Sequence, residues 1–320
     1  MKNSDAPFIS VIIPSYNSFR TIGKTIQGIQ AQKSYHDIKE IIVVDSSDDG
    51  LTRNFLNRCD ISSLRTIRSG VKVMPGLQRN IGAEESKGDL LVFTDSDTIP
   101  ETDWLCQIKK AYFNGTMIGG GSYLMDKSQL QNPMVVAEYY LELGEYIPKG
   151  KPRRKRVIPS GNMFCDRELF FKVDGFPQIR ASEDSLFCLN VSEHSPVYFI
   201  PDATLIHMFR ENKPSSLSNL ILMGKYLIIY RKIYYQGLFM NKAFLFTLFP
   251  FIVIYKFIKV YFRALFSGWR HFMRINKALP QFLLCAKYWS LGIWKGIFEE
   301  ENLENYAKKK YSKNSKVSWL

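Results

Sequence analysis

Short apolar runs alternate with helical patterns along the first hundred residues of the chain. Residues 8–14 read FISVIIP and residues 39–45 read KEIIVVD, and such β-branched runs predict strands buried on both faces of a sheet. Between them, residues 18–32 carry isoleucines at helical spacing. The alternation continues with strands at 63–68 and 89–94 and a helix at 76–86. This pattern predicts an α/β fold, a single Rossmann-like and mostly parallel sheet with right-handed crossovers.

The pattern changes further along the chain. After residue 115 it loosens through GGGSYLMD, and then predicts helices at 135–144 and from Ser182, followed by a strand at 196–201. From residue 211 onward, aromatic and aliphatic residues recur at helical spacing among lysines and arginines. We therefore predict one sheet domain at residues 1–210 and a C-terminal helical extension at residues 211–320.

The net charge of +13 lies in that extension. Residues 1–210 hold 25 Lys+Arg and 25 Asp+Glu, whereas residues 211–320 hold 18 and 5. The basic residues are interleaved with apolar runs such as FLFTLFPFIVIY. A basic surface that is also apolar fits an anionic membrane better than the phosphates of a groove. We therefore expect a membrane surface as a partner and no nucleic acid.

The most apolar stretch of the extension is short for a membrane span. Residues 243–255 are 13 uncharged residues, about 20 Å of helix against a hydrocarbon core of about 30 Å. Pro250 would kink this helix. A span over residues 238–262 stays open because flanking lysines can snorkel, but an interfacial helix or short hairpin fits the aromatic and cationic mixture better. A helical subdomain that packs on the sheet domain, or an oligomer interface, is the alternative.

Cysteine usage and the first residues indicate the compartment. The five cysteines are an odd set with no two within three residues of each other, which argues against a zinc knuckle or a fully paired disulfide framework. The opening MKNSDAPFIS has no apolar segment of the kind that directs secretion. We expect the protein at the cytoplasmic face of the cell membrane, peripheral or with one short membrane segment.

Acidic residues follow two of the predicted strands. Asp45 ends one apolar run, and Asp95 and Asp97 follow another. Ligands of open α/β sheets bind beyond the carboxyl ends of strands. In an extended backbone Asp95 and Asp97 project to the same face, and a divalent cation relieves the repulsion between two neighbouring carboxylates. These oxygen ligands suit Mg²⁺ or Mn²⁺. The alternative is a structural role without a metal, in which this segment only caps the next helix.

At these residues the sequence resembles the family 2 glycosyltransferases of the A-type fold. The resemblance covers roughly residues 8–210. The motifs that carry it, in chain order, are ISVIIPSYN, VVDSSDDGLT, GLQRNIGAEESKGDLLVFTDSDTIP, SGNMFCDRELFFKVDGF and the pair Glu183-Asp184. The resemblance implies a metal-dependent enzyme that transfers a sugar from a nucleotide-sugar donor to a hydroxyl acceptor, with inversion at the anomeric carbon.

The resemblance also assigns residues on the donor side. Pro14 is expected to line the nucleoside pocket, and Asp45 to bond the base. Arg79, in the pattern R-N-x-G, is expected to contact the nucleotide. Asp95 is placed near the ribose, and Asp97 is assigned to the metal.

On the acceptor side, Asp184 resembles the catalytic base. Two adjacent positions on a helix diverge by about 100°, so Glu183 is left to contact or orient the acceptor. Gly161 and Asn162 are expected beside the donor sugar. His207 is a candidate metal ligand, although a histidine in an apolar strand is more often a core residue.

Two hypotheses of different class follow. The first is an active inverting glycosyltransferase at the cytosolic membrane face, in polysaccharide or glycolipid synthesis, with an acceptor that a lipid could carry. The second is a catalytically silent, membrane-bound scaffold of the same fold. A dinucleotide-binding oxidoreductase is disfavoured because the first strand ends in PSYN and lacks G-x-G-x-x-G. The run KGKPRRKR at residues 149–156 is read either as a solvated loop or as a clamp on a phosphate.

Overall fold

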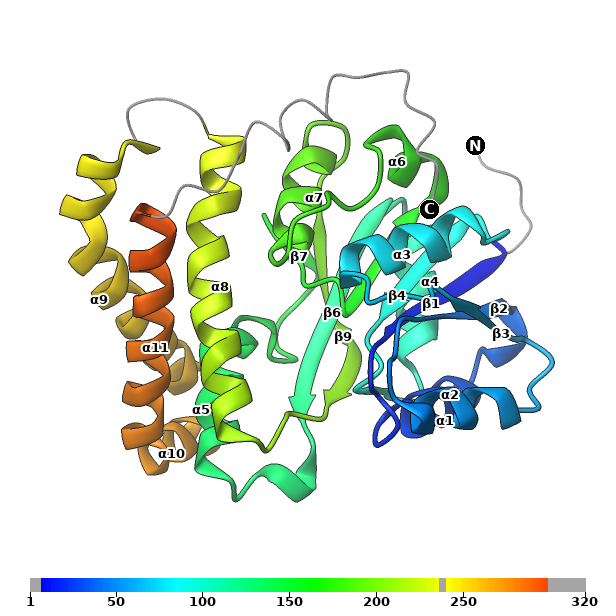
Figure 1. Ribbon diagram of the computed structural model, residues 1–320, viewed down its shortest axis with the longest axis horizontal. Helices are drawn as coiled ribbons and strands as arrows, with labels where there is room; N and C mark the ends of the chain where they lie inside the picture. Colours follow the sequence, from blue (N-terminus) through cyan, green and yellow to red (C-terminus); the bar gives the residue numbers. More distant parts are fainter. Residues whose placement is uncertain (1–6, 236–239, 299–320) are drawn as a thin grey trace.

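The computed structural model describes residues 7–235 and 240–298 of the chain. A mixed sheet forms its centre, and helices cover both faces and one end (Figure 1). The strands of this sheet are β1 (Ile9–Ser15), β2 (Ile38–Asp45), β3 (Leu64–Arg68), β4 (Leu90–Thr94), β5 (Thr98–Pro100), β6 (Ile118–Met125), β7 (Arg153–Arg154), β8 (Asn162–Asp166) and β9 (Tyr198–His207). The predicted α/β fold with a C-terminal set of helices is confirmed.

The sheet is parallel in its first half and mixed in its second. The strand order is β3-β2-β1-β4-β8-β6-β9-β5, and β7 pairs with β9. Strands β3, β2, β1 and β4 are parallel neighbours, as the alternation of strands and helices predicts. Strand β8 runs antiparallel to both β4 and β6. The expectation of a mostly parallel sheet therefore holds for the part that contains the two acidic strand ends.

Four helices of the sheet domain lie close to the predicted ranges 18–32, 76–86 and 135–144 and to the predicted start at Ser182, whereas the helices at 50–58 and 167–172 were not predicted. The helices of this domain are α1 (Ile22–Gln30), α2 (Gly50–Arg58), α3 (Pro75–Glu84), α4 (Trp104–Phe113), α5 (Pro133–Glu142), α6 (Arg167–Lys172) and α7 (Glu183–Ser192), with short 3₁₀ turns η1 (Tyr35–Asp37), η2 (Lys127–Gln129) and η3 (Gly144–Tyr146). Several begin at a capping side chain. Asp49, for example, accepts a hydrogen bond from the Thr52 N–H at the start of α2.

Strand β6 was not predicted, because its sequence opens with three consecutive glycines. Glycine is depleted in strands, but here the packing leaves no room for a side chain. A Cβ atom at Gly120 would lie 2.2 Å from the Asn162 carbonyl oxygen, and one at Gly121 would lie 1.7 Å from that of Ala203. The glycines therefore let β6 approach the neighbouring backbone closely.

The C-terminal helices stand together at one side of the molecule, opposite β1, β2 and β3 (Figure 1). They are α8 (Lys213–Tyr234), α9 (Lys242–Ser267), α10 (Trp269–Lys277) and α11 (Leu279–Phe298). Helices α8 and α11 touch backbone to backbone, since a Cβ at Gly224 would lie 2.1 Å from the Trp289 carbonyl and one at Gly292 2.1 Å from that of Ile221. The buried core runs on from the sheet into these helices. The division near residue 211, between β9 and α8, stays a prediction.

The predicted membrane segment falls mainly on α9. Among the described residues, α9 is the helix that is long and apolar enough to cross a membrane, and its most apolar window is only 11% buried. Pro250 lies inside this helix. The beginning of the 238–262 segment lies outside the described residues. Core helices of soluble proteins pass the same test of length and composition, so the membrane assignment needs further argument.

Candidate active site

Three parallel strands end at one level of the sheet and form the donor side of the candidate site. The register pairs Ser15 at the end of β1 with Asp45 at the end of β2, and Asp45 with Arg68 at the end of β3. Pro14 is buried one residue before the end of β1 and pairs in register with Val44. The parallel register thus brings residues from three distant parts of the sequence to one sheet edge.

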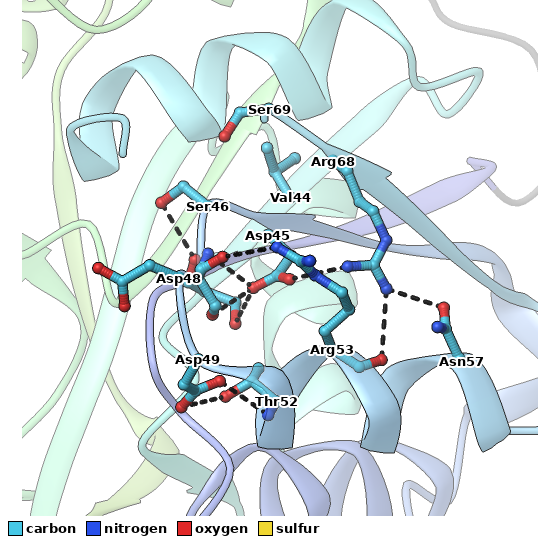
Figure 2. A network of polar contacts seen from close by, with 12 residues as sticks. Val44, Asp45, Ser46, Asp48, Asp49, Thr52, Arg53, Asn57, Arg68 and Ser69 are labelled. Carbon is cyan, nitrogen blue, oxygen red and sulfur yellow. Dashed lines mark hydrogen bonds and ion pairs between the residues drawn. The ribbon is translucent and has the colours of Figure 1, made fainter. Parts of the chain in front are cut away.

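Asp45 is held in a fixed orientation at this edge. One oxygen, Oδ1, accepts hydrogen bonds from Ser15 Oγ at 3.1 Å and Ser47 Oγ at 2.6 Å. The other, Oδ2, lies 3.7 Å from the Arg68 guanidinium, which also donates to Asn57 (Figure 2). The side chain of Asp45 is only 1% exposed. A buried carboxylate with one such weakly engaged oxygen can accept a hydrogen bond from a ligand.

Arg79 is placed differently from the expectation. Its side chain is 3% exposed and lies between two carboxylates, with 2.5 Å from Nη2 to Asp95 Oδ1 and 3.0 Å from Nη1 to Glu183 Oε1. Its Nε is buried without a hydrogen-bond partner among the described residues. Burial lowers the pKa of Arg79, but the charges of Asp95 and Glu183 outweigh burial and raise it. In this structure Arg79 links α3 to the end of β4 and to α7.

Asp95 and Asp97 do not project together from an extended strand. The chain turns at this point, where the Thr98 N–H donates to the Asp95 carbonyl and the two threonines Thr94 and Thr98 are hydrogen-bonded through their hydroxyls. The argument from strand alternation is therefore wrong in its geometry. Burial raises the pKa of Asp97, His207 opposes this shift, and the negative charge of Asp95 adds to it.

Asp97 faces His207 across the pairing of β5 with β9. The distance from Asp97 Oδ1 to His207 Nε2 is 3.8 Å, and the register pairs Thr98 with His207. The Nδ1 atom of His207 is buried without a partner among the described residues. Within the same residues, no three His, Cys, Asp or Glu side chains gather into a group that could hold a metal ion. A carboxylate and an imidazole that face each other fit a divalent cation whose other ligands come from a substrate or water.

Asp184 and Glu183 open helix α7. Asp184 accepts hydrogen bonds from the Ser160 N–H at 3.3 Å and the Ser185 N–H at 2.6 Å. Burial raises the pKa of Asp184, and these hydrogen bonds oppose the shift. Burial and the neighbouring charge of Asp184 raise the pKa of Glu183 to about 7, although Arg79 acts against them. The two side chains engage different partners, as expected for adjacent helical positions.

The segment around Gly161 joins the two sides of the site. A Cβ at Gly161 would lie 2.2 Å from Asp95 Oδ2, and the preceding residue bonds Asp184. Asn162 is fully buried. Its Oδ1 accepts a hydrogen bond from Trp104 Nε1 at 2.8 Å, and its Nδ2 donates to the Ser122 carbonyl at 2.9 Å and the Ala203 carbonyl at 3.0 Å. Asn162 therefore hydrogen-bonds to three segments of the core in this structure.

Gln78 is a residue of this edge that the sequence reasoning missed. Its amide nitrogen donates to the Ser15 carbonyl at 2.8 Å, to the Val44 carbonyl at 2.7 Å and to Ser46 Oγ at 3.1 Å. It thereby satisfies the backbone carbonyl groups at the carboxyl ends of β1 and β2. Its position directly before Arg79 was the only signal in the sequence.

Comparison with known proteins decides the family. The profile described as "Glycosyl transferase family 2" matches residues 10–171, which contain β1 to β8 and the residues of the donor side. This chain belongs to glycosyl transferase family 2. The match ends before Glu183, Asp184 and His207, so the roles of these three residues in the family 2 chain stay predictions.

Curated relatives are similar over part of their length. The chain is 28% identical to "Glycosyltransferase AglE" of Haloferax volcanii over 179 residues, which are 54% of this chain and 57% of AglE. It is 35% identical over 95 residues to "Poly(ribitol-phosphate) beta-N-acetylglucosaminyltransferase TarS" of Staphylococcus aureus, which are 28% of this chain and 16% of TarS. This family 2 chain thus matches little more than half of AglE and a small part of TarS.

Solved structures share the fold of this family 2 chain. A mannosyltransferase from Pyrobaculum calidifontis, in complex with GDP-Man and Mn²⁺, superposes with a TM-score of 0.61 at 18% identity and covers 93% of this chain and 89% of its own. Residues 1–349 of Staphylococcus aureus TarS, in complex with UDP-GlcNAc, give a TM-score of 0.54 at 15% identity, and the match covers 90% of this chain and 91% of that fragment. Both alignments extend over the C-terminal helices as well as the sheet.

Proposed function

We propose that this chain is an inverting glycosyltransferase that moves a sugar from a nucleotide-sugar donor to a hydroxyl acceptor. One observation carries the proposal: the backbone at Ser160 and Gly161 lies against Asp95 on one side and Asp184 on the other. The donor-side carboxylate and the candidate base thus lie across one short segment. An enzyme that brings a donor and an acceptor together needs this proximity.

The donor side is assigned to the nucleotide. Asp45 is the acceptor for a donor group of the base, and its two serine partners keep Oδ1 oriented. Pro14 lines the same edge. Asp95 faces the ribose, while Arg79 holds Asp95 in place through their ion pair. In this assignment Arg79 orients the pocket and does not touch the nucleotide.

Asp97 and His207 would hold a Mn²⁺ or Mg²⁺ ion. When bound, such an ion neutralises the diphosphate and stabilises the charge that develops on the leaving group. The chain's own contribution is a partly buried carboxylate and an imidazole on neighbouring strands. Both residue types are ligands that Mn²⁺ accepts. The Mn²⁺ in the Pyrobaculum calidifontis mannosyltransferase complex supports the choice of ion.

Asp184 is assigned as the base. Its pKa is raised by burial, so it is a stronger base than an exposed aspartate. It takes the proton of the acceptor hydroxyl as the oxygen attacks the anomeric carbon, and the nucleoside diphosphate leaves from the opposite face. The Ser160 and Ser185 N–H groups donate to the Asp184 carboxylate and hold it in a fixed orientation. Glu183, which pairs with Arg79, is assigned to contact or orient the acceptor.

The C-terminal helices are assigned to an anionic membrane surface on the cytoplasmic side. The apolar residues that α9 exposes support this assignment. Polysaccharide or glycolipid synthesis is the corresponding process. The acceptor stays a hydroxyl compound of unassigned identity.

The test is the release of nucleoside diphosphate from a panel of UDP- and GDP-sugars with Mn²⁺. We expect the wild-type chain to hydrolyse at least one donor slowly in the absence of acceptor. The Asp184 carboxylate should be required only for transfer to the acceptor. Asp184→Asn should slow acceptor-dependent turnover by about 10² to 10⁴ with the donor Kd within about twofold. Glu193→Asn, at the exposed end of the same helix, is the control. If no nucleotide binds with Mn²⁺ present, the scaffold hypothesis replaces this one.

A further inference from the structure

A group of three cations surrounds one carboxylate beside the candidate acceptor side. Glu145, in η3, pairs with Lys155 through Oε1, and its Oε2 lies 3.4 Å from Arg263 Nη1 and 4.0 Å from Lys259 Nζ. Each of these side chains is between 18% and 39% exposed. We call Lys155, Lys259 and Arg263 the cation cluster. It carries three positive charges against one negative charge.

The basic loop at residues 149–156 is largely exposed but is anchored at both ends. Lys149 donates to the Phe266 carbonyl near the end of α9, and Arg156 contacts the Tyr235 hydroxyl after α8. Between them, β7 (Arg153–Arg154) pairs with β9. The loop therefore holds Lys155 against α9 in a defined place.

The cation cluster lies close to the candidate base. Tyr146, the residue after Glu145, packs against Tyr123 with 6.5 Å between the ring centroids, and the Tyr123 hydroxyl would lie 3.2 Å from a Cβ at Gly161. Lys155 also lies over the Tyr146 ring, at 5.4 Å from the centroid. Five residues after Lys155, the Ser160 N–H bonds Asp184. A ligand in the cluster would therefore approach the acceptor side of the site.

An apolar helix face adjoins the cluster on its other side. Helix α9 exposes a row of large apolar residues on one face: Phe251, Ile254, Tyr255, Ile258, Phe262 and Phe266. Lys259 and Arg263 each follow one of these residues by one position, which places them about 100° around the helix. The cluster thus lies between an apolar surface and the base.

We propose that the cation cluster binds the phosphate of a lipid-linked acceptor, whose apolar chain lies along the exposed face of α9. The proposal rests on the proposed function and names its acceptor class. A phosphate ester replaces the Glu145 carboxylate as the partner of Lys259 and Arg263 through charge-assisted hydrogen bonds. A sugar hydroxyl carried on that phosphate then reaches Asp184. Free phosphate carries the same charge but has no apolar chain that could contact the exposed face of α9.

The test measures binding of farnesyl phosphate to the full chain in detergent, with farnesol and inorganic phosphate as comparisons. We expect Lys259→Gln/Arg263→Gln to weaken farnesyl phosphate binding at least tenfold. The matched control, Arg270→Gln/Lys277→Gln, removes two exposed charges from α10 and should leave binding within twofold. If both variants lost the same affinity for farnesyl phosphate, the cause would be general electrostatic attraction, and the proposed site would be wrong.

Glu145→Gln is the second variant, and it should change the affinity for farnesyl phosphate in the opposite direction. Since Glu145 competes with the phosphate for the same cations, its neutral form should bind farnesyl phosphate more tightly. An unchanged or weaker affinity would mean that the group is only a structural ion-pair network. Inorganic phosphate or farnesol that binds as tightly as farnesyl phosphate would also overturn the assignment. UDP and GDP binding with Mn²⁺, measured on the same sample, separates failure of this inference from failure of the proposed function.

Discussion

Gly161→Ala should damage the donor side through one added methyl group. The Cβ would lie 2.2 Å from Asp95 Oδ2, 2.8 Å from its Cγ and 3.2 Å from the Tyr123 hydroxyl. The first two separations are below 3.0 Å, which real Cβ atoms essentially never show. Asp95 must therefore rotate away, and its 2.5 Å ion pair with Arg79 breaks.

The size of the effect follows from what each partner retains. Arg79 keeps its pair with Glu183, and the Asp95 side chain is 33% exposed and regains water. The full loss of about 3–5 kcal/mol for an unpaired buried charge does not apply. We expect the overpacking cost of about 1–3 kcal/mol in the free energy of unfolding. Because Asp95 leaves the ribose side, the Kd for UDP or GDP with Mn²⁺ should rise at least tenfold.

Urea unfolding and nucleotide titration together test this reasoning. Gly50→Ala is the matched control, because a Cβ at Gly50 meets nothing within 4 Å and should change stability by less than about 1 kcal/mol. A Gly161→Ala chain as stable as wild type, with an unchanged nucleotide Kd, would refute the packing of Gly161 on Asp95. Lost stability with unchanged affinity would remove Asp95 from the nucleotide site.

Three further predictions concern the metal, the acceptor side and the membrane. Asp97→Asn should weaken Mn²⁺-dependent nucleotide binding at least tenfold in calorimetric titration and leave the fold intact; wild-type affinity at limiting Mn²⁺ would reject Asp97 as a ligand. The pKa of Glu183 is about 7 in the fold against 4.5, so its contribution to stability is complete below about pH 4.5 and is lost as the pH rises towards 7. Glu183→Gln should therefore flatten the fall in unfolding free energy over this range, by at most about 1.4 kcal/mol per pH unit; parallel pH curves would contradict the shift. The full chain should float with anionic liposomes at 0.15 M salt and only in part at 1 M salt, since each Lys or Arg near the surface contributes about 1 kcal/mol; a folded, monodisperse chain that stays at the bottom would exclude the membrane surface.

The sequence predicted the strands that carry the donor side well, because buried parallel strands leave a strong signal. The apolar runs ended close to the observed ends of β1, β2 and β4, and the parallel register then determined that Ser15 and Asp45 meet. Local chemistry was less predictable. The turn after Thr94 depends on hydrogen bonds with Thr98, which a strand pattern does not reveal.

Long-range contacts explain the remaining differences. The sequence places Arg79 and Glu183 about a hundred residues apart, and no periodicity indicates that they form an ion pair in the interior. The same holds for Asn162, whose amide is used by three segments of the core. The glycines of β6 read as a loop until the neighbouring carbonyls that they accommodate are in place. In each case the decisive partner lies on another element.

The ion pairs of α9 bear on whether this helix crosses a membrane or lies on its surface. Glu145 of the sheet domain contacts Lys259 and Arg263, so one side of the helix is docked on the domain by charge. Insertion across a bilayer would break these contacts, and the uncharged run 243–255, about 20 Å of helix, is shorter than a hydrocarbon core of about 30 Å. A helix that lies in the interface keeps both contacts and still buries Phe251, Phe262 and their neighbours at the headgroup boundary. We therefore infer that α9 lies on the membrane surface, which also brings the cation cluster to the level of lipid phosphates.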